Sequence, residues 1–269
     1  MIKANFHTHT IYCDGKNTPE EMVRAAIGLG MTAIGFSGHA YSIYEPYGMK
    51  ADACTAYRSD ILQLREKYAN QITILLGIEQ DATSNPPDYP YDYLIGSIHG
   101  FFKNGHYISV DESEESMVQS VKDYYDGDYY AYAEDYYDTL ANTVLKYNPT
   151  FIGHFDLLTK FNEGGKYFDE SHPRYQAAAL GALNALAKAN KPFEINTGAI
   201  SRGYRTTPYP ASFILKALYD LGGKIILSGD SHACDGLLCA YEKATELAKS
   251  CGFATAMVLT PDGFCEESL

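Results

Sequence analysis

Hydrophobic and polar residues follow one another along this chain in two alternating kinds of segment. Short runs rich in β-branched and aromatic residues are typical of buried strands. Longer stretches with apolar residues three to four positions apart are typical of helices. The short runs predict seven strands, over residues 2–6, 32–37, 72–78, 92–98, 150–153, 192–195 and 224–228. A last apolar run, Phe253 to Leu259, predicts either an outer strand or a short element of the tail.

Helices are predicted between these strands. The first one has a clear start, because Thr18 is suited to the N-cap, Pro19 to the first helical position and Glu21 to the closing position of a capping box. It is expected to end near Gly28 to Gly30, where glycine tolerates the backbone of a helix C-terminus. Further helices are expected over residues 52–69, 112–125, 128–147, 173–190, 208–221 and 236–250.

Strands that alternate with helices form βα units, and such units build a parallel sheet. Seven units in a row favour a closed barrel over an open sheet. No linker or change in composition divides the sequence, so we expect residues 1–269 to form a single domain of the α/β class.

Composition narrows the classes of function. Apolar residues make up 46% of the chain, which is enough for a sizeable core. The net charge of −13, from 21 basic and 34 acidic residues, argues against a nucleic-acid partner. The six cysteines form no CxxC pair, and no apolar run approaches the ~18 residues of a membrane span. Since no signal peptide is recognisable either, we expect a cytoplasmic protein with reduced thiols and no membrane partner.

Histidines and acidic residues recur where the predicted strands end. In a parallel α/β fold the carboxyl ends of the strands meet on one face, so these side chains are expected to converge. Convergent imidazoles and carboxylates are the usual ligands of divalent metal ions. The pattern predicts a multinuclear metallohydrolase, and its members are His7, His9, His39, Glu79, His99, His154, Glu194, Asp230 and His232.

Spacing supports a shared site. His7 and His9 are two residues apart on a strand, so their side chains point the same way, and Asp230 and His232 repeat this arrangement on the last barrel strand. A carboxylate after a buried strand, such as Glu79, needs a cation to offset its burial. Any one of these histidines could instead be a buried structural residue or a surface residue. It is their common position at strand ends that favours ligands.

The ordered motifs HTHT, GFSGH, GIE, GSIHG, GHFDLL and SGDSH resemble the polymerase and histidinol phosphatase (PHP) superfamily. Within it, the GHFDL run followed by Lys160-Phe161-Asn162, and the run Glu194-Ile195-Asn196-Thr197-Gly198, are similar to histidinol-phosphate phosphatases. The resemblance implies a distorted (β/α)7 barrel with a trinuclear metal site at the carboxyl ends of its strands.

The resemblance also implies how the ligands divide. The first ion would be held by His7, His9, Glu79 and Asp230, and Glu79 would bridge to a second ion completed by His99 and His154. The third ion would be held by Asp14, His39 and His232. Many phosphatase relatives carry a histidine in a longer loop near Asp14, so this third site departs from the family pattern. Nitrogen and oxygen ligands suit Zn, Mn and Fe alike.

The activity that the resemblance implies is hydrolysis of L-histidinol phosphate, a small-molecule phosphate ester, by a metal-bridging hydroxide. Arg202, Arg205 and Lys160 follow predicted strands on the same face and are candidate phosphate contacts, although each could be a solvated loop cation. Asp230 or a metal-bound water could protonate the leaving group. Glu194 could orient a ligand histidine or meet a cationic group of the substrate.

Two other readings stay open at this point. One is a PHP-type phosphatase that acts on phosphotyrosine protein or on another small phosphate ester. The other is a non-catalytic metal-binding module, which the complete set of ligands argues against. The loop from Tyr41 to Tyr47, which contains Glu45, follows His39 and is a candidate wall of the leaving-group pocket.

Overall fold

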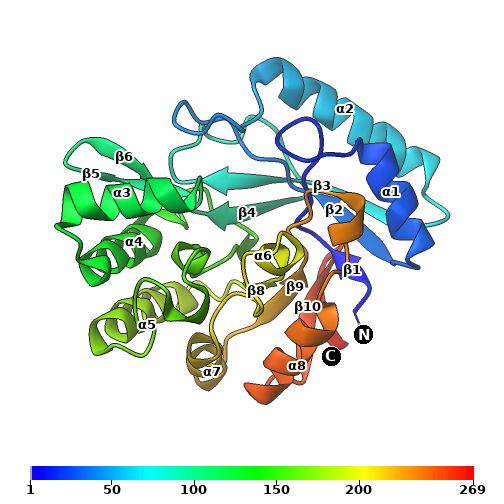
Figure 1. The fold of residues 1–269 in the computed structure, drawn as a ribbon. Coiled ribbons are helices and arrows are strands. Elements are labelled where there is room, and N and C mark those ends of the chain that lie inside the picture. Colours follow the sequence, from blue (N-terminus) through cyan, green and yellow to red (C-terminus); the bar gives the residue numbers. More distant parts are fainter. Residues whose placement is uncertain (1) are drawn as a thin grey trace.

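The computed structural model describes residues 2–269 and contains a curled sheet of nine strands in the order β1-β2-β3-β4-β7-β8-β9-β10-β11 (Figure 1). Neighbouring strands pair in parallel, except that β10 and β11 are antiparallel. The strands are β1 (Ala4–Asn5), β2 (Ala33–Phe36), β3 (Thr73–Asp81), β4 (Tyr93–Ser97), β7 (Phe151–Ile152), β8 (Phe193–Asn196), β9 (Ile225–Ser228), β10 (Thr255–Thr260) and β11 (Gly263–Ser268).

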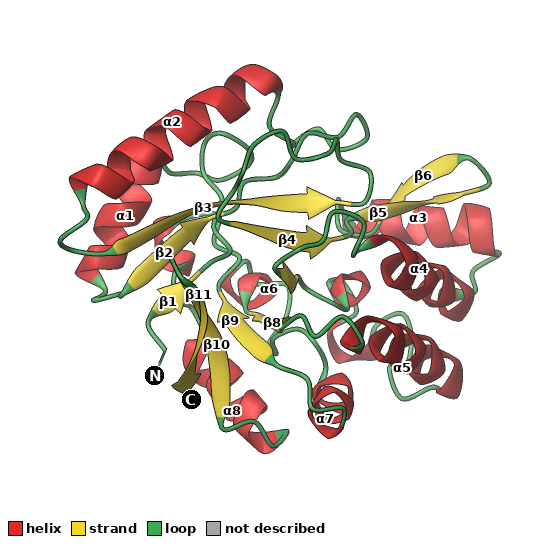
Figure 2. Cartoon of the chain, turned by 180° about the vertical axis from the view of Figure 1, so that it is seen from behind, coloured by secondary structure: helices red, strands yellow, loops and turns green. Residues whose placement is uncertain are grey.

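Most helices lie around the outside of the curled sheet, and the short helix α6 lies near its centre (Figure 2). As predicted, α1 begins after Thr18, whose hydroxyl accepts from the Glu21 backbone N–H while the Glu21 carboxylate accepts from the Thr18 backbone N–H. The helices are α1 (Pro19–Gly28), α2 (Ala51–Lys67), α3 (Glu114–Tyr125), α4 (Tyr129–Thr143), α5 (Pro173–Ala187), α6 (Gly198–Ser201), α7 (Ser212–Asp220) and α8 (Tyr241–Ser250). Three short 3₁₀ turns are Leu157–Thr159, Glu163–Gly165 and Cys234–Gly236.

The first and the last barrel strand meet just beyond their carboxyl ends. Thr8 forms a parallel bridge with Ser231. The His9 N–H donates to the Ser231 carbonyl at 2.9 Å, and the Ser231 N–H donates to the His7 carbonyl at 2.9 Å. These contacts join the segments that follow β1 and β9, so the architecture is the distorted barrel that the sequence predicts. The apolar run near the end of the chain is an outer strand, β10, which pairs with β9 and carries β11 on its far side.

One hairpin was not predicted. Strands β5 (Gly100–Lys103) and β6 (His106–Ser109) pair in antiparallel register outside the barrel, directly after the strand-end residue His99. The hairpin leads into α3 and lies beside the carboxyl end of β4 (Figure 2).

The interior of the barrel is filled by aromatic side chains. The Tyr93 ring crosses it and donates its hydroxyl to the Phe6 carbonyl at 2.7 Å. A Cβ atom at Gly77 would come within 2.3 Å of this ring, so only glycine leaves room for it on β3. The interior is therefore a packed core, and polar chemistry is confined to the carboxyl ends of the strands. Within residues 2–269, no helix is long and apolar enough to cross a membrane.

Candidate metal centre

The nine predicted metal ligands gather at the carboxyl ends of the barrel strands. They form four overlapping groups in which the donor atoms all lie within 4.8 Å of one another. The groups are His7, His9 and Asp230; His7, Glu79 and His154; His39, Glu79 and His99; and His9, Asp14, His39 and His232. Each predicted ligand belongs to at least one group, although the groups divide His99 and His154, which the family resemblance assigns to the same ion.

Glu79 lies at the centre of the cluster and is 1% exposed. Its Oε1 is 3.0 Å from His154 Nε2 and 3.5 Å from His99 Nε2. Its Oε2 is 2.9 Å from His39 Nδ1 and 3.2 Å from His7 Nε2. The two oxygens therefore face different histidines, as a carboxylate that bridges two ions requires.

Charge balance keeps this carboxylate ionised. Burial by itself would raise the pKa of Glu79, but the nearby His7, His99 and His39 outweigh burial and lower the pKa well below its usual value. The same balance applies at Asp230, where burial is outweighed by Arg202 and His7 and the pKa is again well below the usual range. Both groups are thus in the form that binds a cation.

Three buried atoms at the centre make no hydrogen bond: His7 Nε2, His9 Nε2 and Glu79 Oε2. Buried polar atoms without partners are costly and rare. Nitrogen and carboxylate oxygen atoms that face one another in a buried space are satisfied together by a divalent cation. The donor set therefore fits several divalent metal ions, and its mixture of imidazole and carboxylate suits Zn, Mn or Fe.

The group around Asp14 lies at the mouth of the barrel. Asp14 Oδ2 is 3.1 Å from His232 Nε2, and Asp14 Oδ1 is 3.6 Å from His39 Nε2. The structure adds His9 to this group, since its Nδ1 is 3.6 Å from Asp14 Oδ1. Burial would raise the pKa of Asp14, but His39 and His232 lower it below its usual value. Asp14, on the short first loop, thus lies within reach of His9, His39 and His232.

A second layer of carboxylates holds the histidines. Glu194 Oε1 is 2.6 Å from His7 Nδ1, and Glu194 Oε2 accepts from the His154 backbone N–H at 2.7 Å. This contact places a proton on Nδ1 of His7 and directs its Nε2 into the cluster, the orienting role considered for Glu194. Asp81 contacts His99 in two places, because its Oδ2 accepts from the His99 backbone N–H at 2.7 Å and lies 3.4 Å from Nδ1 of the ring. Asp81 was missed, although it follows Glu79 by two residues on the same strand and so points the same way.

Arg202 lies against the cluster. Its guanidinium donates to the Asp230 carbonyl at 2.8 Å and to Asp230 Oδ2 at 3.0 Å, and its Nη1 lies 2.9 Å from His232 Nδ1. Its side chain stays 26% exposed. Close approach of α6 is possible because Gly198 has no side chain: a Cβ atom there would come within 2.7 Å of Asp230 Oδ2.

The two other predicted phosphate contacts have different partners. Arg205 is 9% exposed, donates to the Thr159 carbonyl at 2.7 Å and lies near Glu163 and Glu170, none of which belongs to the metal cluster. These contacts tie together the loops after β7 and β8. The geometry therefore favours a structural role for Arg205.

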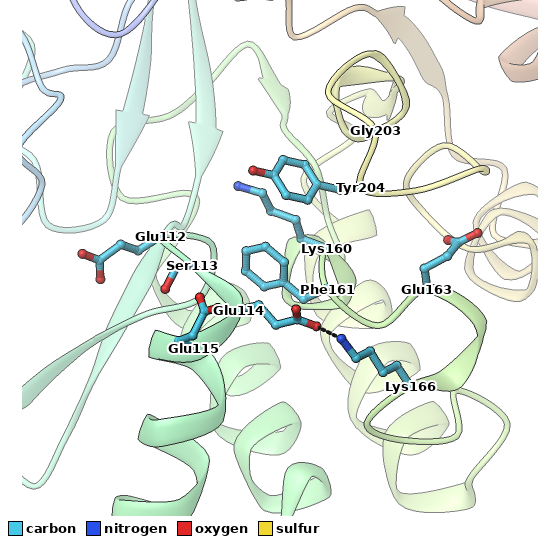
Figure 3. A pocket seen from close by; sticks show the side chains of 10 residues that line it. All are labelled: Glu112, Ser113, Glu114, Glu115, Lys160, Phe161, Glu163, Lys166, Gly203 and Tyr204. Carbon is cyan, nitrogen blue, oxygen red and sulfur yellow. Dashed lines mark hydrogen bonds and ion pairs between the residues drawn. The ribbon is translucent and has the colours of Figure 1, made fainter.

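Lys160 donates to the Asp111 carbonyl at 2.7 Å and lies 3.2 Å from Asp111 Oδ2. Its ammonium group sits over the ring of Tyr204 and above Phe161, beside a cavity of about 410 Å³ (Figure 3). Across that cavity Glu114 pairs with Lys166, and none of the residues that line the pocket belongs to the metal cluster. Asp111 was missed because it follows the unpredicted hairpin.

A distorted parallel barrel with a polynuclear histidine and carboxylate centre defines a class of metal-binding barrel proteins. The chain belongs to the PHP domain family, whose model matches residues 5–198. Asp230 and His232 lie beyond the matched residues and complete the cluster from the segment that follows β9.

Individual relatives are distant in sequence. A probable histidinol-phosphatase of Schizosaccharomyces pombe is 24% identical over 285 aligned residues, which cover 97% of this chain and 91% of the relative. Two crystal structures share the fold. A candidate histidinol phosphatase of Listeria monocytogenes has a TM-score of 0.75 and 20% identity over 89% of this chain and 98% of its own. A histidinol phosphate phosphatase of Lactococcus lactis, solved with zinc, L-histidinol and phosphate, has a TM-score of 0.69 and 24% identity over 98% of this chain and 100% of its own.

Proposed function

We propose that this protein is a metal-dependent phosphomonoesterase that hydrolyses L-histidinol phosphate to L-histidinol and phosphate. The observation that carries the proposal is the position of Glu79, whose two oxygens face separate sets of histidines around buried atoms that lack hydrogen bonds. Similarity to named histidinol phosphatases over nearly the whole chain supports the choice of substrate.

The residues that would hold the metal ions are those of the four groups: His7, His9, Asp14, His39, Glu79, His99, His154, Asp230 and His232. Bound divalent ions would activate water for attack on phosphorus and neutralise charge on the phosphate oxygens. Glu194 and Asp81 would fix the orientation of His7 and His99 before substrate arrives, so that no reorganisation is needed during the reaction.

Arg202 would supply the positive charge beyond the metals. It is held against Asp230 by two hydrogen bonds and is still partly exposed, so its free edge can reach a phosphate oxygen. Asp230 would remain ionised, since its pKa is lowered well below neutral pH. An ionised Asp230 serves as a ligand and as the partner of Arg202, which leaves protonation of the departing alcohol to another group.

We further propose that residues 1–269 act as one PHP domain. The segment after β9 carries Asp230 and His232, and the bridge between Thr8 and Ser231 joins it to the segment after β1. All six cysteines are free thiols, which supports a reducing compartment such as the cytoplasm.

Phosphate release from L-histidinol phosphate tests the proposal. The purified protein is assayed after reconstitution with Mn or Zn, with a chelator as control, and beside phosphotyrosine and p-nitrophenyl phosphate. Chelator-sensitive release with a clear preference for L-histidinol phosphate is expected. A preference for phosphotyrosine, or no preference, would keep a PHP phosphatase but reject this substrate. No turnover of any ester by metal-loaded protein would indicate a metal-binding module.

A further inference from the structure

A second cavity, of about 370 Å³, opens from the metal cluster at Asp14. One of its walls is the loop after His39, and the other is the segment that runs from β6 into α3. Tyr47, on the first wall, packs its ring 4.5 Å from the ring of His39 and 5.9 Å from that of His99. The cavity is therefore directly connected to the proposed metal site and is large enough for the alcohol part of a small phosphate ester.

The walls of this cavity carry an excess of negative charge. Its lining includes four acidic residues, Asp14, Glu45, Asp111 and Glu112, and a single cation, Lys160. The ammonium group of Lys160 is already engaged by the carbonyl and the carboxylate of Asp111. A bound cation would therefore balance the negative charge of the cavity walls.

Among these acidic residues, Glu45 gives the strongest evidence for a cationic ligand. It is 5% exposed, and its Oε1 is buried without a hydrogen-bond partner. Asp111 Oδ1 is also buried and unpartnered. Burial raises the pKa of Glu45 to about 7, although the nearby His99 and the Tyr47 hydroxyl act against that rise. Two buried carboxylate oxygens without donors, in one cavity, cost free energy that a bound cation with N–H groups would recover.

We infer that Glu45, with Asp111, forms the subsite for the leaving group and selects phosphate esters whose alcohol carries a cationic nitrogen. This inference rests on the proposed phosphatase activity and adds to it the residues that choose the substrate. With the phosphate at the metal cluster, the alcohol extends past Asp14 into the acidic cavity. Its nitrogen donates to Glu45, and the rings of Tyr44 and Tyr47 line the same cavity.

A matched pair of esters isolates the charge. Phosphoethanolamine carries an ammonium group, and ethyl phosphate has the same two-carbon chain without it. In Glu45→Gln, the ratio of kcat/KM for phosphoethanolamine to kcat/KM for ethyl phosphate should fall by about tenfold to hundredfold, because one hydrogen bond between charged groups is lost. Asp111→Asn should lower the same ratio and serves as the second variant if Glu45→Gln folds poorly. An unchanged ratio in both variants would overturn the inference.

A control variant removes the same charge elsewhere. Glu115→Gln alters an exposed position on α3 that lies outside this cavity, and the ratio should stay within about twofold of that of the parent protein. A fall as large as that of Glu45→Gln would mean that overall charge, and not a subsite, sets the preference.

A binding measurement separates this inference from the proposed function. Calorimetry with L-histidinol and the metal-loaded protein needs no turnover. Weaker binding by Glu45→Gln, by tenfold or more, supports the subsite even if no ester is hydrolysed, in which case only the proposed function fails. Equal binding by both proteins, together with active phosphatase, rejects the subsite and leaves the proposed function intact.

Discussion

Replacing Glu194 by glutamine tests whether a buried carboxylate prepares the metal centre. Glu194 is fully buried and accepts four hydrogen bonds: from His7 Nδ1 and the Ser228 hydroxyl at Oε1, and from the His154 backbone N–H and Asn196 Nδ2 at Oε2. Glutamine has only one accepting oxygen. If that oxygen serves His154 and Asn196, the amide N–H faces His7.

The physical effect falls on the tautomer of His7. With an amide N–H beside it, Nδ1 becomes an acceptor and the ring proton moves to Nε2, the atom that faces Glu79 at 3.2 Å. A metal ion must then displace this proton. Loss of an outer partner of a ligand histidine costs about tenfold to hundredfold in metal affinity, which is about 1.4–2.7 kcal/mol. The metal-free protein should lose less stability, because a hydrogen bond to His7 is kept with its direction reversed.

Competition between the protein and a chromophoric chelator measures the affinity for Zn or Mn, and thermal unfolding of the metal-free protein measures stability. Ser228→Ala is the matched control, since it removes another contact of Glu194 Oε1 but leaves the carboxylate on His7. Metal affinity of Glu194→Gln within about threefold of that of the parent protein would refute the reasoning. So would an equal loss of affinity in Ser228→Ala.

Three further predictions concern the bound metal ions, Arg202 and the buried Asp156. Metal removal should lower Tm, because a ligand at 100 times its Kd stabilises the folded state by about 2.7 kcal/mol; an identical Tm with and without chelator would argue against a resident metal. Arg202→Lys keeps the charge but loses the paired contacts with Asp230, so kcat/KM for phosphate esters should fall about tenfold or more, and steady-state kinetics checks this. Asp156 is buried, which raises its pKa to about 7 from an ordinary 3.8. The folded state therefore binds the extra proton, and the contribution of Asp156 to the stability of the metal-free protein should fall as pH rises from about 4 to 7, by at most about 4 kcal/mol. Asp156→Asn should flatten this slope in denaturant unfolding, and an unchanged slope would contradict the assignment.

The barrel was predictable because each of its strands is a short buried run flanked by polar residues. Segment ends were less accurate: the helix expected over 128–147 is α4, which ends at Thr143. The hairpin β5–β6 was missed although its turn carries a signal. Asn104 and Gly105 both have positive φ, at 50° and 81°, and an Asn-Gly pair between two strands is typical of such a turn.

The site was predictable where ligands lie at strand ends. It was less predictable where the conformation of a loop determines the position of a side chain. Each of the nine proposed ligands lies in the cluster because a strand or the first loop carries it there. Arg205 could not be placed from sequence, since its partners Thr159 and Glu170 come from a separate loop. Glu45 was tied to the leaving-group pocket only by its position after His39. Its burial and its unpartnered oxygen depend on how the loop folds back over the cavity.

The bridge between Thr8 and Ser231 has a consequence for synthesis of the protein. His7 and His9 leave the ribosome first, whereas Asp230 and His232 follow more than 200 residues later. At 5–20 residues per second, the early histidines wait on the order of ten to forty seconds for their partners. During that interval an incomplete chain presents a partial set of ligands, so capture of the full complement of metal ions belongs to the end of translation, when the last barrel strand docks against the first.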